Sequence, residues 1–114
     1  MKDLILLFGD NLDVREIVRY FDPPFHYVDN DRCIIDYKDC YISIDQDQSM
    51  EMHCENNEMR EIISLLGSPY FYILRFPGLS SILKGLSDIG KKHVFLLDDD
   101  HGFIGSMEGF LAIN

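Results

Sequence analysis

Residues 40–47 read CYISIDQD, and this stretch points to the fold class because its apolar and polar residues alternate. In an extended strand, neighbouring side chains point to opposite sides. One side of this strand carries Cys40, Ile42 and Ile44. The other side is polar and carries Tyr41, Ser43, Asp45 and Asp47. Such alternation is typical of an antiparallel sheet with one buried and one solvated face.

Two shorter strands are predicted just before this stretch, at residues 25–28 and 33–38. The cluster Asp29-Asn30-Asp31 separates them, and side chains of this kind readily bond nearby backbone amides in turns. Residues 25–47 therefore predict a meander of three antiparallel strands.

The flanking segments alternate between apolar strands and amphipathic helices. Strands are predicted at residues 4–8, 70–76 and 93–97, and the aromatic residues of 70–76 favour a central position in the sheet. Helical spacing predicts helices at residues 14–21, 59–66 and 79–89. Asn56 or Asn57 is expected to cap the second helix and Gly67 to end it.

We therefore predict a single α+β domain spanning residues 1–114. It has a mixed or antiparallel sheet of about five to six strands and three helices, in the order β-α-β-β-β-α-β-α-β. Helices are expected on one face of the sheet or partly on both. A short strand at residues 103–104 and a last helical turn capped by Ser106 are further candidates.

The charge of the chain is concentrated in its middle. Residues 22–61 hold eleven acidic and three basic side chains, a net charge of −8 out of −10 for the whole chain. Binding to nucleic-acid phosphates or to anionic membranes needs clustered Lys and Arg, so we expect neither kind of partner. A cationic partner protein is favoured instead.

The sequence also carries an expectation about compartment. No apolar run has the length and cleavage site of a secretory signal, and none approaches the roughly 20 residues of a spanning helix. The three cysteines are odd in number and lack Cys-x-x-Cys spacing, which indicates reduced thiols. We therefore expect a cytoplasmic protein.

The predicted partner-binding residues form two groups. Asp45 and Asp47 beside Tyr41 form the first, because tyrosine supplies contact area and the carboxylates complement Arg or Lys. Neighbouring strands and turns extend it with Asp31 and Asp36. The second group is the turn Asp98, Asp99 and Asp100. An ordinary solvated surface with charges that protect a sheet edge explains the same residues, and that alternative stays open.

Catalytic and metal-binding motifs fit the chain poorly. Cys33, Cys40, His53 and Cys54 lack the paired spacing of structural zinc ligands, and Cys33 and Cys40 fall at apolar strand positions. Cys54 is surrounded in sequence by Glu51, Glu55 and Glu58, which oppose thiolate formation. Gly-x-Ser-x-Gly and glycine-rich phosphate loops do not occur. We expect a binding protein rather than an enzyme, with no cofactor and no metal.

Two segments resemble bacterial toxin immunity proteins, including those of contact-dependent growth inhibition. They are the acid-rich segment 22–61 and the closing FLLDDDHGFIG at residues 95–105, an apolar strand followed by an acidic turn and Gly-Phe-Ile-Gly. The resemblance implies a protein that binds a cognate toxin domain, often a basic nuclease, and occludes its active site.

Two alternatives remain from the residues. A DNA-mimicking or regulatory module that acts on a nucleic-acid-binding protein shares the same electrostatics. A small metal-dependent enzyme could use the cluster from Asp98 to His101, because Mg²⁺ prefers carboxylates and water.

Overall fold

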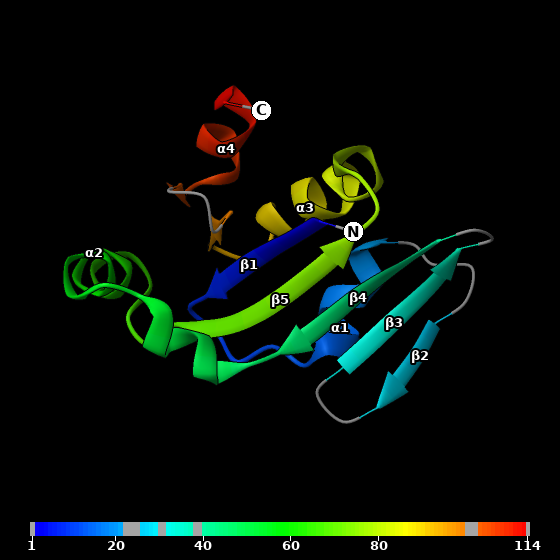
Figure 1. The fold of residues 1–114 in the computed structure, drawn as a ribbon, viewed down its shortest axis with the longest axis horizontal. Coiled ribbons are helices and arrows are strands. Elements are labelled where there is room, and N and C mark those ends of the chain that lie inside the picture. Colours follow the sequence, from blue (N-terminus) through cyan, green and yellow to red (C-terminus); the bar gives the residue numbers. More distant parts are fainter. Residues whose placement is uncertain (1, 22–25, 30–31, 38–39, 100–102, 114) are drawn as a thin grey trace.

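The computed structural model describes residues 2–21, 26–29, 32–37, 40–99 and 103–113. Seven strands in these ranges form one sheet in the order β2-β3-β4-β5-β1-β6-β7 (Figure 1). Every neighbouring pair is antiparallel. The strands are β1 (Lys2–Phe8), β2 (His26–Asp29), β3 (Arg32–Tyr37), β4 (Cys40–Gln46), β5 (Tyr70–Phe76), β6 (Phe95–Asp98) and β7 (Ile104–Gly105).

Four α-helices accompany the sheet in the described ranges, with short 3₁₀ turns before or after three of them. The α-helices are α1 (Val14–Val18), α2 (Asn56–Leu66), α3 (Leu83–Gly90) and α4 (Met107–Ile113). The 3₁₀ turns are η1 (Arg19–Phe21), η2 (Gln48–His53) and η3 (Leu79–Ser81). The predicted α+β class and element order are confirmed. The short strand and the last helical turn that were candidates near the end of the sequence correspond to β7 and α4.

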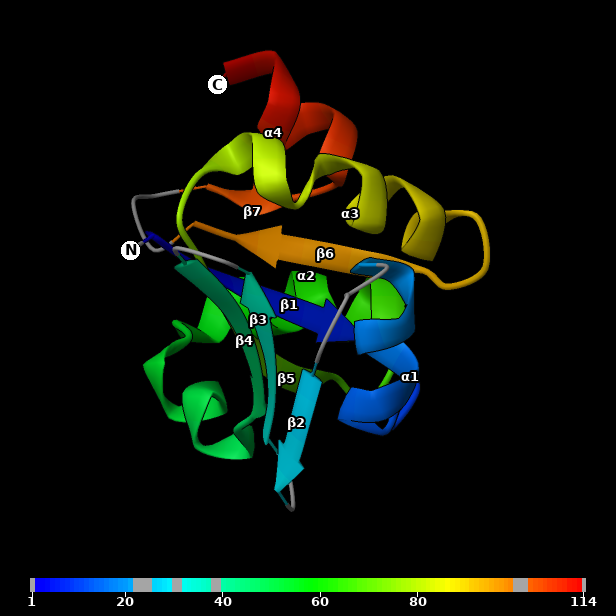
Figure 2. The same cartoon turned by 90° about the vertical axis from the view of Figure 1, so that its right-hand side faces the viewer.

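The helices cover the two faces of the sheet unequally. Figures 1 and 2 show α1 and α3 on one side of the strands and α2 on the other. The side chains agree, because buried residues of α1, α3 and α4 share one hydrophobic cluster and Ile62 of α2 belongs to a second. Of the two expected arrangements, helices on one face or partly on both, the structure has the second.

The first cluster, here the larger core, fills the face beneath α1, α3 and α4. Alternate residues of the central strands point into it, including Leu6, Ile44 and Leu74, which are fully buried. The hydroxyl of Tyr72 donates a hydrogen bond to the backbone oxygen of Leu12 at 2.5 Å. Gly85 of α3 contacts the ring of Phe21 so closely that an added Cβ would lie 2.6 Å from it. These contacts fix α1, η1 and α3 against the sheet.

The second cluster, here the smaller core, lies on the opposite face beneath α2. Its buried members are Ile5, Leu7, Ile62, Phe71 and Leu96. Figure 1 shows α2 at one end of the sheet, leaving the front of β3 and β4 uncovered by a helix. Strand β5 lies between β4 and β1, which confirms its predicted central position.

The start of α2 differs from the prediction. Glu55, and not Asn56 or Asn57, is the N-cap residue, with extended backbone angles of φ −72° and ψ 156°. Its backbone N–H donates to the carboxylate of Glu58 at 3.3 Å. A glutamate three residues into a helix satisfies a free backbone donor in this way. The helix ends as predicted at Gly67, whose positive φ of 79° disfavours other residues.

Candidate partner-binding surface

The predicted patch on β4 carries a carboxylate whose charge is balanced within the sheet. Asp45 pairs with Arg32 of β3 at 2.5 Å and with Arg75 of β5 at 3.5 Å. Arg75 also pairs with Asp3 of β1 at 3.6 Å. Opposite charges therefore alternate across four strands, and we call these residues the charge ladder. Because the side chain of Asp45 is 19% exposed and faces two cations, its negative charge is largely neutralised locally.

The other residues predicted to lie on the polar side of this stretch have different surroundings. Tyr41 is 42% exposed and remains accessible on the open face. Ser43, predicted to face solvent, is buried at 3% exposure because its short side chain lies between its longer register partners, Ile34 of β3 and Arg75 of β5. Asp47 lies beyond the end of β4, where its carboxylate accepts hydrogen bonds from the backbone N–H and the hydroxyl of Ser49. Asp47 therefore caps η2.

The remaining predicted residues lie partly outside the described parts of the chain. Asp31 and Asp100 fall outside the described residues, and Asp36 lies in β3 with its side chain not described. Asp99 accepts a hydrogen bond from the backbone N–H of Phe103, just before β7, at 3.1 Å. Asp98, half-buried at the end of β6, pairs in register with Ile5 and Ile104 on the α2 side of the sheet.

A different set of acids gathers around the N-terminal half of α2. Three of them surround the half-buried thiol of Cys54, although they come from η2, α2 and β6. Burial is the largest cause of the raised pKa of Cys54, followed by the negative charges of Asp98, Glu58 and Glu51. We call this set the α2 acidic surface; its members are Glu51, Glu55, Glu58, Glu61 and Asp98.

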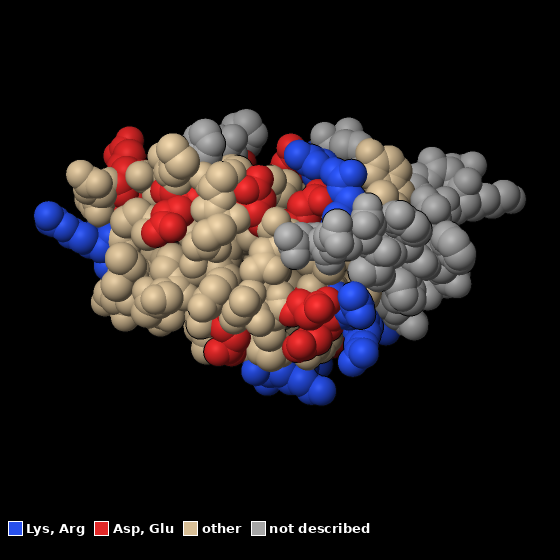
Figure 3. Space-filling view, turned by 90° about the horizontal axis from the view of Figure 1, so that it is seen from below, with Lys and Arg blue, Asp and Glu red and all other residues tan. Residues whose placement is uncertain are grey.

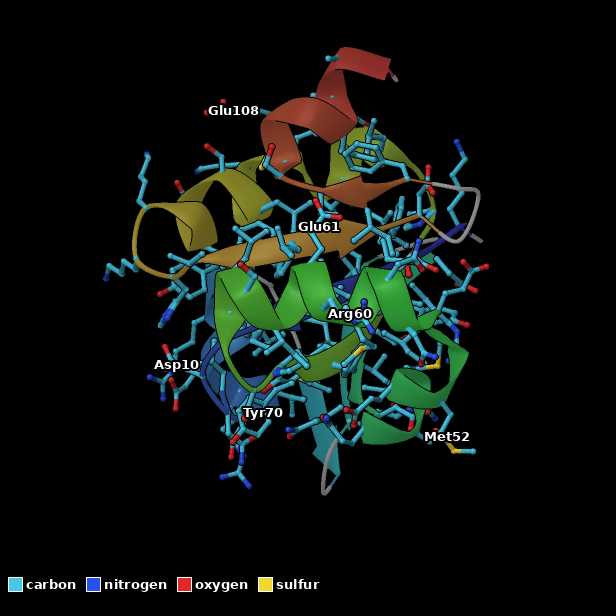
Figure 4. The ribbon with its side chains drawn as sticks, turned by 90° about the vertical axis from the view of Figure 1, so that its left-hand side faces the viewer. Asp10, Met52, Arg60, Glu61, Tyr70 and Glu108 are labelled. Carbon is cyan, nitrogen blue, oxygen red and sulfur yellow. The ribbon has the colours of Figure 1, made fainter. Side chains whose placement is uncertain are left out.

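The four glutamates of the α2 acidic surface differ from Asp45 of the charge ladder, because none of them has a cation partner among the described residues. Glu51, Glu55, Glu58 and Glu61 form no ion pair with any residue in the described part of the chain. Arg60 is the one Lys or Arg between Glu51 and Glu61 in the sequence. Figure 4 shows Glu61 extending from α2 toward β6 and β7, whereas Arg60 lies on the side of the helix away from β7.

The distribution of colours on the molecular surface fits this distinction. Figure 3 shows acidic and basic side chains next to one another over the middle of the face seen from below Figure 1. Neighbouring opposite charges cancel at distances beyond a Debye length of about 8–10 Å. The net charge of a sequence segment therefore does not show where on the surface a carboxylate lacks a neighbouring cation.

Sequence reasoning did not single out Glu51, Glu58 or Glu61 as site residues. Glu58 and Glu61 are three residues apart and so share one side of a helix, next to the buried Ile62. That spacing was a usable signal. The approach of Glu58 to Asp98, which is 40 residues beyond it in the sequence, depends on the pairing of β1 with β6.

The described residues offer little for metal or thiol chemistry. No three His, Cys, Asp or Glu side chains among them come together as metal ligands. Cys33 is buried in the larger core, as predicted, and burial raises the pKa of its thiol. The raised pKa of Cys54 has the sign expected from its acidic neighbours and keeps it in the thiol form at neutral pH. Within the described ranges, none of the helices has the length and apolar character to cross a bilayer.

Comparisons with known proteins add no family to this picture. No family model matches the chain, and neither a curated protein nor a solved structure matches it.

Proposed function

We propose that the chain is a binding protein that neutralises a cognate toxin domain, in the manner of an immunity protein, and that this toxin is a basic nuclease. The observation that carries the proposal is the α2 acidic surface. It presents four glutamates without cation partners among the described residues, on elements held in place by the smaller core. A rigid anionic surface of this kind complements a cationic one.

The physics of nuclease inhibition fits such a surface. A nuclease binds phosphates with clustered Lys and Arg, and carboxylates on a fixed scaffold can occupy the positions of those phosphates. Complementary charge also speeds association to around 10⁸–10⁹ M⁻¹s⁻¹ at low salt. Fast capture matters because a toxin has to be neutralised before it acts. Occlusion of the active site then requires no catalytic group on this chain.

Specificity needs more than charge, since any basic protein is attracted to an acidic surface. Exposed apolar side chains beside the acids supply a shape to recognise. Ile63 and Leu65 of α2 are 51% and 60% exposed, and Met52 of η2 is 86% exposed. An interface with an apolar centre and a charged rim has this composition.

Co-expression tests the proposed function directly. Where the neighbouring gene encodes a toxin domain, the chain is expressed together with that domain, in cells that die when the toxin is expressed alone. We expect growth to be restored and the purified chain to inhibit the nuclease activity in vitro. Cells that still die, with both proteins present at comparable levels, would contradict the proposal.

Charge-matched variants then locate the contact surface. Glu51→Gln with Glu61→Gln removes two charges from the α2 acidic surface, and Glu16→Gln with Asp88→Asn removes two from α1 and α3. We expect the first pair to slow association with the toxin domain about five- to tenfold at low salt, since unpaired surface charges act mainly on the on-rate. Equal on-rates for the two pairs would show that the α2 acidic surface is not the contact.

A further inference from the structure

A small pocket lies between α2 and the edge formed by β6 and β7. It encloses about 60 Å³. Its floor and walls are apolar and consist of Ile62, Leu65, Leu96 and Ile104. Gly105 and two carboxylates, Glu58 and Glu61, complete the lining.

The size of the pocket limits what it can hold. Pockets for drug-sized ligands and cofactors measure roughly 300–1,000 Å³. The volume of about 60 Å³ lies well below that range. The pocket therefore suits one end of a side chain rather than a whole small molecule.

The chemistry of the lining selects the kind of side chain. An anion in the pocket would be repelled by Glu58 and Glu61. A neutral polar group would leave the negative charge of these carboxylates uncompensated. An aliphatic side chain would use the apolar walls and leave the carboxylates desolvated. A long basic side chain satisfies both, because its methylene stem packs on apolar surface while its charged head reaches acceptors at the rim.

The two carboxylates are placed to act together. Glu58 already accepts the backbone N–H of Glu55 through one oxygen, which holds its side chain in place. Glu61 is exposed, makes no hydrogen bond or ion pair with a described residue, and extends toward β6 and β7 in Figure 4. Leu65, one turn further along the same side of α2, continues the apolar wall.

We propose that this pocket receives the arginine side chain of a partner protein, with its guanidinium group between Glu58 and Glu61 and its stem against Ile104 and Leu65. Arginine is preferred to lysine because its planar group donates to two carboxylates at once and is more weakly hydrated. The inference rests on the proposed function in one respect, since the toxin domain would supply the arginine.

Small probes test the pocket without the partner. The ¹⁵N-labelled chain is titrated with n-butylguanidinium, and the amide shifts of α2, Ile104 and Gly105 are followed by NMR. n-Butylurea serves as a neutral probe of the same shape. We expect saturable shifts with millimolar affinity for n-butylguanidinium, weaker binding of n-butylammonium and no saturation with n-butylurea. Equal binding of the urea, or tighter binding of the ammonium probe, would overturn the proposal.

Two conservative variants separate the pocket from general surface charge. Glu61→Gln is expected to weaken n-butylguanidinium binding about three- to fivefold, as for an exposed charge pair. Glu16→Gln removes an equal charge from a hollow on the opposite side of the sheet that also contains Arg19 and Lys92, and it is expected to change nothing. Equal effects of the two variants would contradict the pocket assignment.

The outcomes for the pocket and for the proposed function are distinguishable. If the probes fail to bind and the chain still protects cells from the toxin, the pocket assignment is wrong and the proposed function stands. If the probes bind at α2 and Ile104 but the chain does not protect cells, the pocket assignment stands for a different basic partner. Each experiment thus decides one of the two statements.

Discussion

The two faces of the sheet are built from the same strands and carry different kinds of residues. Among the described residues, the larger core buries twenty and the smaller core five. The first face is covered by α1, α3 and α4, whereas α2 covers one end of the second. Strands β1 and β5 are therefore buried on both faces of the sheet. On the second face, β3 and β4 have a charged and partly open surface. The stability of the fold and the surface available to a partner are thus divided between the two faces.

Neighbouring leucines of β1 allow the sharpest test of this division. Leu6 points into the larger core and Leu7 into the smaller core, and both are fully buried. We expect Leu6→Ala to lower the free energy of unfolding by about 3–5 kcal/mol and Leu7→Ala by about 2–3 kcal/mol, because the cost of a cavity depends on how far its surroundings can collapse. Helix α2 packs at one end of the sheet and has more freedom to close the gap.

Urea denaturation of both variants measures these values, and Leu65→Ala on the exposed side of α2 is the matched control. That control is expected to change the free energy of unfolding by less than about 0.5 kcal/mol. A larger loss for Leu7→Ala than for Leu6→Ala would reverse the assignment of the main stabilising face.

Tyr72 belongs to the larger core, and its substitution is expected to have an effect of intermediate size on the free energy of unfolding. Tyr72→Phe removes the hydrogen bond to the Leu12 carbonyl and is expected to cost about 1–2 kcal/mol at neutral pH. Tyr70→Phe, on the neighbouring half-buried tyrosine, is the control and is expected to cost less. Urea denaturation compares the two variants, and equal losses would show that the hydrogen bond to Leu12 contributes nothing.

The same residue predicts a pH dependence. Burial raises the pKa of Tyr72 from 10 to about 12 in the folded chain. The unfolded chain therefore loses this proton first, so the contribution of Tyr72 to stability is complete below pH 10 and is lost as the pH rises toward 12. Stability of the natural chain should fall more steeply in this window than that of Tyr72→Phe, by up to about 2–3 kcal/mol. Parallel curves from pH 9 to 12 would contradict this.

The charge ladder on the open face gives the smallest expected effect. Asp45→Asn should lower the free energy of unfolding by about 1 kcal/mol or less, since both arginine partners are substantially exposed. A double-mutant cycle with Arg32→Gln measures the coupling, which is expected to shrink as salt is raised from 50 mM to 1 M. A coupling that does not change with salt would mean that the ladder behaves as buried structure and not as open surface.

Much of the fold followed from local pattern. The alternation in β4 predicted a strand because the side chains of a strand have a period of two. The apolar run of β1 and the aromatic run of β5 predicted buried strands. Helical spacing likewise located α2 and α3. The N-cap of α2 was predicted wrongly, because Asn56 and Asn57 are good caps by residue type, yet the chain is still extended at Glu55 and the carboxylate of Glu58 is placed to accept its N–H.

The candidate site was less predictable than the fold. Periodicity placed Asp45 on the less buried side of its strand, but periodicity carries no information on which strands become its neighbours. Pairing with β3 and β5 brought Arg32 and Arg75 to it and balanced its charge. The approach of Asp98 to Glu51 and Glu58 has the same origin, since it depends on the order of strands in the sheet.

By itself, the sequence determined the fold class, the order of elements and an excess of negative charge, because these follow from local periodicity and from composition. The tertiary structure decided which carboxylates keep that charge. Electrostatic compensation acts over a few ångströms in space and not along the chain, so the strand order neutralised Asp45 and left Glu51 and Glu61 without cation partners among the described residues. The pocket beside Glu61 has the same cause, because α2 and β7 meet only in the folded sheet.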